Sequence, residues 1–207
     1  MNDVQTLAKE YCALVGLAEP TIGHYVQNDV EQAKEIATAY EALPTYDTSI
    51  ATLNAYTALK AEIELQYDYA VLHGFTFENW TQEGQPYANS RELCEDVLNN
   101  KHMWVFTGGD VHPLLGETNN KFRAVHDLFG HCAEGFQFGP RGEHNAWLHH
   151  SMMFSSTAQR ALTTETRGQN SWVNYGPYSN LPVTERPFAE QKVALLPDVY
   201  CNWYRFL

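Results

Sequence analysis

The sequence predicts a mainly α fold (α+β): a single compact helical domain, residues 1–207, with a small two-stranded sheet. Apolar side chains recur three and four residues apart along most of the chain, as they do on the buried face of a helix. Only two short segments alternate with a period of two residues, which is typical of strands. No internal repeat or low-complexity linker divides the chain, and its length fits one domain. Residues 1–74 form a helical scaffold portion, and the residues that suggest chemistry lie in the second portion, residues 75–207.

Three helices are predicted in the scaffold portion. Their apolar stripes run along residues 4–14, 30–40 and 50–70. The second helix ends at Leu43, because a residue that precedes proline avoids the helical region. Asp47 or Thr48 can cap the third helix, and Gly74 ends it. The apolar faces of these helices carry no cluster of polar side chains, so we assign them to the scaffold.

Both predicted strands lie early in the second portion. They are residues 75–78 and 102–106, and a helix that Ser90 can cap lies between them. Further helices are predicted over about residues 119–138, 143–162 and 187–197. The polar segment of residues 163–180 contains too many helix breakers for regular structure.

The charge and the cysteines limit the choice of partners and compartment. The chain has 25 acidic and 13 basic residues and a net charge of −12, so binding to nucleic acid or to a membrane surface is not expected. No apolar run approaches the ~20 residues that span a bilayer, and no signal peptide is visible. The four cysteines form no CxxC pair, which indicates reduced thiols in a cytoplasmic protein.

The residues that suggest chemistry centre on one histidine-rich stretch. Five of the nine histidines lie between His126 and His150, and the most informative string is HDLFGH, residues 126–131. Two histidines five residues apart diverge by about 140° on a regular α-helix. They can still reach one ion from the two sides of a groove, since Gly130 lets the helix end loosen. Asp127 can orient one of the imidazoles by accepting its second N–H.

This string resembles the iron-binding segment of the pterin-dependent aromatic amino acid hydroxylases. The resemblance implies that His126 and His131 bind a non-haem Fe(II) ion. Thr163-Thr164-Glu165-Thr166 resembles the T-x-E segment of the same family and implies that Glu165 is the third ligand. Two imidazoles and one carboxylate form a facial triad that leaves positions open on the ion.

Other residues compete for the role of third ligand. Glu134 lies three residues after His131 on the same helical face, so it is the alternative to Glu165. Glu165 is preferred, because its polar segment can fold back over the histidines. A two-metal site would use residues of the next helix, but it usually needs two ExxH motifs, and the sequence contains none. The candidates considered for that site are Glu143, His144, His149 and His150.

Arginines and aromatic residues near the string are candidates for substrate binding. Arginine can hold a carboxylate or phosphate through two hydrogen bonds, and aromatic rings can stack on a co-substrate. The candidates are Arg123, Trp147, Arg167, Trp172 and Tyr175.

These observations predict a non-haem Fe(II) monooxygenase that uses O2 to hydroxylate a small aromatic or amino-acid-like substrate. Its electron donor could be a tetrahydropterin, as the resemblance implies, a 2-oxo acid, or neither. One alternative is a zinc-dependent metallohydrolase, in which Glu134 or Asp127 acts as general base on a metal-bound water. Another is a non-enzymatic metal- or ligand-binding module.

Overall fold

The computed structural model describes residues 2–20, 25–109 and 111–201. In these ranges the fold is mainly α with one two-stranded sheet, which confirms the predicted fold class. The elements before the sheet are α1 (Asp3–Leu14), α2 (Val30–Ala42) and α3 (Ile50–Leu72). Leu43 is extended and ends α2, as expected of a residue before proline. Ser49, rather than Asp47 or Thr48, caps α3, and the Asp47 carboxylate instead accepts hydrogen bonds from Ser49 and Thr52.

The two strands form a parallel pair. β1 (Thr76–Trp80) and β2 (His102–Phe106) run in register from Thr76 beside His102 to Trp80 beside Phe106. The predicted helix between them is α4 (Ser90–Asn100), which Asn89 caps. A parallel pair needs such a crossover, because a tight turn joins only antiparallel strands.

The rest of the chain contains more helix than the sequence pattern predicts. The elements are α5 (Thr118–Val125), the π-helix η1 (His126–Cys132), α6 (Pro140–Ser151), α7 (Ser156–Thr163), the π-helix η2 (Thr164–Gly168), α8 (Gln169–Tyr175) and two 3-10 turns, η3 (Val183–Glu185) and η4 (Asp198–Tyr200). The predicted helix of residues 119–138 therefore ends at Cys132, and that of residues 143–162 is two helices.

Two predictions for the C-terminal part are wrong. The polar segment of residues 163–180 is helical as far as Tyr175. Gly168 lies within this helical segment, and a Cβ atom there would lie 2.7 Å from the Tyr40 ring, so the glycine permits close packing against α2. The predicted last helix of residues 187–197 does not form, and Val193 instead makes an isolated bridge with Tyr46.

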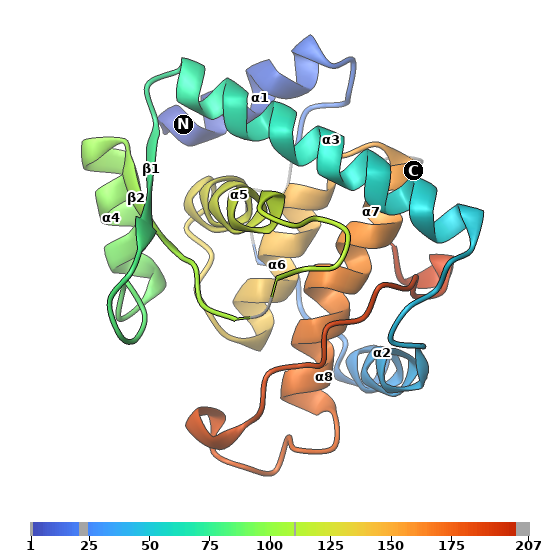
Figure 1. Ribbon diagram of the computed structural model, residues 1–207. Coiled ribbons are helices and arrows are strands. Elements are labelled where there is room, and N and C mark those ends of the chain that lie inside the picture. Colours follow the sequence, from blue (N-terminus) through green and yellow to red (C-terminus); the bar gives the residue numbers. More distant parts are fainter. Residues whose placement is uncertain (1, 21–24, 110, 202–207) are drawn as a thin grey trace.

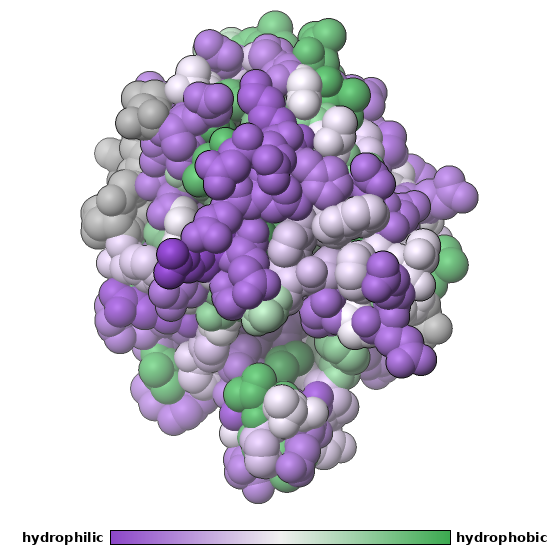
Figure 2. Space-filling model, turned by 90° about the vertical axis from the view of Figure 1, so that its left-hand side faces the viewer, coloured by the Kyte–Doolittle hydropathy of each residue, from purple (hydrophilic) through white to green (hydrophobic). Residues whose placement is uncertain are grey.

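One large core joins most elements. α3 crosses the molecule and packs on α5 and α7, whereas α2 lies beside α8 (Figure 1). The main cluster of buried apolar residues includes members of α1, α3, α5, α6 and α7, and a small second cluster lies between α2 and α8. Figure 2 shows that hydrophilic side chains cover most of the face on the α4 side of the molecule. Among the described residues, no helix is both long and apolar enough to cross a membrane.

Candidate metal centre

The two histidines of the HDLFGH string lie side by side because their segment is a π-helix. Backbone bonds in this region join residues five apart: the N–H of Ala133 donates to the carbonyl of Leu128, and that of Phe136 to the carbonyl of His131. A turn that closes on the fifth residue brings His126 and His131 to one face. Their ring centroids are 5.3 Å apart. The divergence of about 140° expected for an α-helix is therefore absent.

Glu143, from the first turn of α6, completes a cluster with this pair. Its carboxylate oxygens lie 3.4 Å from Nε2 of His131 and 3.7 Å from Nε2 of His126. One ligand atom from each of the three residues lies within 4.8 Å of the other two. Neighbouring ligand atoms at right angles around an ion, each bonded at about 2.1 Å, are roughly 3 Å apart. The cluster is therefore close to the geometry of a metal site.

Gly130 lets α6 approach the histidines. A Cβ atom at Gly130 would lie 3.2 Å from the carbonyl oxygen of Ala146 and 3.3 Å from Cε1 of His126. Ala146 is one turn along α6 from Glu143. The glycine thus allows close packing between η1 and α6, rather than the loosened helix end expected from the sequence.

Glu143 and His131 influence each other's ionisation across their 3.4 Å contact. Nδ1 of His131 lies 2.9 Å from the carbonyl of Phe136 and donates to it, so Nε2 is the nitrogen that faces Glu143, and it can carry a proton or bind a metal ion there. Burial lowers the pKa of His131, but the Glu143 carboxylate outweighs burial and raises it to about 9. Burial raises the pKa of Glu143, and the two histidines reverse this to hold it well below its usual range. The carboxylate therefore needs a positive partner, which can be a proton or a metal ion.

Glu165 lies outside this cluster, contrary to the expectation that it is the third ligand. It is buried and accepts hydrogen bonds from the Tyr56 hydroxyl, from His112 Nε2 (3.2 Å), and from the side-chain amides of Gln169 (2.9 Å) and Gln191 (3.0 Å). His112 is neutral and protonated on Nε2, because its Nδ1 accepts the backbone N–H groups of Leu114 and Leu115.

Three of these partners of Glu165 were missed from the sequence. Tyr56 belongs to the apolar stripe of α3, and His112 and Gln191 lie in irregular segments with no motif. The assignment of α3 to the scaffold alone was therefore incomplete.

Both acidic groups face one pocket of about 380 Å³. His126 and Glu143 line it, as does Glu165. Arg123 also lines it and donates to the carbonyl of Phe106 at 2.8 Å, while burial lowers its pKa. The remaining lining residues are Asn119, Phe122, Thr166, Gln169, Asn170, Val173, Phe188, Ala189 and Gln191. The pocket thus places a candidate ion beside an aromatic and amide-rich wall.

The other predicted catalytic residues are not in the lining of this pocket. Asp127 lies near both histidines, and its pKa is raised because burial outweighs their attraction. Glu134 lies 3.6 Å from Nε2 of His149 and not beside His131. The π-helical turn ends at Cys132, so the α-helical spacing that paired Glu134 with His131 does not apply.

Four of the five predicted substrate-binding residues also lie elsewhere; only Arg123 reaches the pocket. Arg167 stacks on the Trp147 ring at 4.4 Å. Trp172 donates to Glu41 and packs in the cluster between α2 and α8. The Tyr175 hydroxyl accepts from Asn28 at 3.1 Å. Trp172 and Tyr175 thus contact α2 and the segment before it, away from the pocket.

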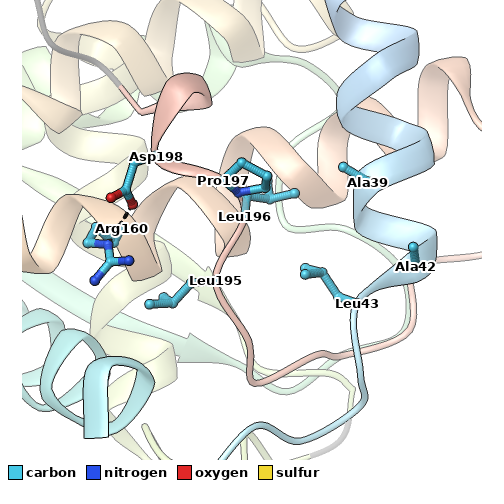
Figure 3. A pocket seen from close by; sticks show the side chains of 8 residues that line it. All are labelled: Ala39, Ala42, Leu43, Arg160, Leu195, Leu196, Pro197 and Asp198. Atoms are coloured by element: carbon cyan, nitrogen blue, oxygen red, sulfur yellow. Dashed lines mark hydrogen bonds and ion pairs between the residues drawn. The ribbon is translucent and has the colours of Figure 1, made fainter. Parts of the chain in front are cut away.

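A larger hollow of about 560 Å³ lies between the end of α2 and residues 195–198 (Figure 3). Alanine, leucine and proline side chains form most of its wall. Its charged residues, Arg160 and Asp198, bind each other at 2.7 Å. It contains no group of metal-ligating side chains, so the smaller pocket is the candidate site.

Comparisons with protein-family models, with curated proteins and with solved structures find no match for this chain.

Proposed function

We propose that this protein is a non-haem Fe(II) monooxygenase that hydroxylates a small aromatic or amino-acid-like molecule, with His126, His131 and Glu143 as metal ligands. The observation that supports this most is the convergence of two imidazoles and one carboxylate beside a pocket. This donor set suits Fe(II) and leaves positions for O2 and for a substrate or co-substrate. Bound there, iron would supply O2 activation.

The residues of the pocket would bind and orient the substrate. Phe122 and Phe188 offer aromatic surface, and Phe188 is 88% exposed, so a ligand can reach its ring. Arg123 can hold a carboxylate. Glu165, fixed by four neutral donors, can accept a hydrogen bond from the substrate or orient the two glutamine amides beside it.

Metal analysis of protein purified without oxygen tests this function. We expect about one iron per chain, O2 consumption that depends on the iron, and loss of both in His126→Ala. Far-UV circular dichroism of the variant provides the control for folding. Full O2 consumption by metal-free protein, or stoichiometric iron in His126→Ala, would contradict the proposal.

The co-substrate can be identified by titration of the Fe(II) protein without oxygen. A visible charge-transfer band on addition of 2-oxoglutarate would indicate direct chelation of the metal by a 2-oxo acid. Perturbed aromatic fluorescence with tetrahydropterin, and no such band, would favour the pterin that the family resemblance implies.

One observation favours a zinc-dependent hydrolase as a second candidate. The same set of two imidazoles and one carboxylate also suits a catalytic zinc ion, which would lower the pKa of a bound water to about 7. This candidate predicts zinc in the purified protein and no O2 consumption.

A further inference from the structure

A buried chain of hydrogen bonds leads from α3 to the metal ligand His126. Gln66 on α3 and His150 at the end of α6 are both fully buried. Nε2 of His150 lies 2.8 Å from Oε1 of Gln66, and its Nδ1 lies 3.2 Å from Nδ1 of His126. Gln66 and His150 belong neither to the metal cluster nor to the lining of the pocket.

The first link fixes the proton of His150. The side-chain amide nitrogen of Gln66 donates to the carbonyl of Met153 at 3.1 Å, which turns the amide oxygen toward His150. An amide oxygen only accepts, so His150 must donate from Nε2. In the neutral ring Nδ1 is then an acceptor.

The second link fixes His126. Because Nδ1 of His150 accepts, Nδ1 of His126 carries a proton and donates it. The lone pair of His126 is therefore on Nε2, the atom that faces Glu143 at 3.7 Å. We propose that His150 is a positioning residue, which, oriented by Gln66, holds His126 in the tautomer and orientation that bind metal through Nε2. The proposal rests on the metal centre proposed above.

Zinc affinity, measured by competition with a chromophoric chelator, tests the positioning. His150→Leu keeps the bulk but removes the acceptor, and should weaken zinc binding by about 10- to 100-fold, as loss of an outer hydrogen bond to a ligand does. His150→Asn restores an acceptor and should recover most of the affinity. His149→Leu is the matched control, because His149 is equally buried and bonds to Phe129 instead of to a ligand. Unchanged affinity in His150→Leu, or an equal loss in His149→Leu, would overturn the proposal.

A second measurement reads the tautomers directly and needs no variant. In metal-free protein with ¹⁵N-labelled histidine, NMR should find the proton of His150 on Nε2 and a proton on Nδ1 of His126. The opposite assignment for either ring would overturn the proposal. Failure of the wild-type protein to bind metal would instead count against the proposed function, since the tautomers are measured without metal.

Discussion

At the scale of single residues, the two acidic groups of the pocket have different surroundings. Glu143 faces two imidazole nitrogens that lack another partner on that side, whereas Glu165 is surrounded by donors. The HDLFGH string could predict the two histidines, because both lie in one short segment. It could not predict Glu143, because the contact depends on how α6 packs against η1.

This difference predicts opposite results for two matched substitutions. Glu143→Gln should lower metal affinity by more than tenfold. Loss of a hydrogen-bond partner of a ligand already lowers metal affinity by about 10- to 100-fold, and loss of a ligand should cost at least as much. Glu165→Gln should leave metal binding unchanged and impair activity only. Competition titration with zinc measures both affinities. If Glu165→Gln loses the metal and Glu143→Gln keeps it, the third ligand is Glu165.

At the scale of elements, the helices of the scaffold could be predicted from apolar periodicity, and the two π-helices could not. A stripe that repeats every three and four residues describes only regular α-helix. At His126–Cys132 and Thr164–Gly168 the backbone bonds join residues five apart, so the facing side chains change. Each segment carries a side chain that lines the pocket, His126 in the first and Glu165 in the second. Apolar periodicity therefore could not predict the directions of the side chains at the candidate site.

Gly130 and Gly168 offer a test of this packing. Gly130→Ala should reduce the free energy of unfolding by about 1–3 kcal/mol through overpacking and should also weaken zinc binding, because the new methyl group contacts Ala146 and His126. Gly168→Ala should destabilise similarly, since its methyl group would meet Tyr40 and Leu196, but it should not change zinc affinity. Urea denaturation and zinc titration measure the two effects. Wild-type zinc affinity in Gly130→Ala would show that η1 and α6 can separate without disturbing the ligands.

At the scale of the whole molecule, stability should depend on pH through partly buried histidines. Burial, with a smaller effect of Arg167, lowers the pKa of His144 to about 4. The unfolded chain takes up this proton below about pH 6.5. The contribution of His144 is therefore complete above that pH and decreases as the pH falls toward 4, where the folded protein is protonated as well.

His144→Asn should therefore make the stability of the metal-free protein less sensitive to pH between about 6.5 and 4. Urea denaturation at several pH values in this range, with wild type and variant compared, measures the effect. Parallel curves for the two proteins would show that His144 does not titrate differently in the folded and unfolded states.

The bonds around Glu165 also bear on how the protein folds. They join this residue to partners 109, 53 and 26 positions away in the chain, Tyr56, His112 and Gln191. Bringing such distant segments together loses loop-closure entropy before any bond forms, so high-contact-order structure forms slowly. We expect the helices to form first and this wall of the pocket to close last. A chain still emerging from the ribosome would therefore lack the bonds from Gln191 to Glu165 until residue 191 has left the ribosome.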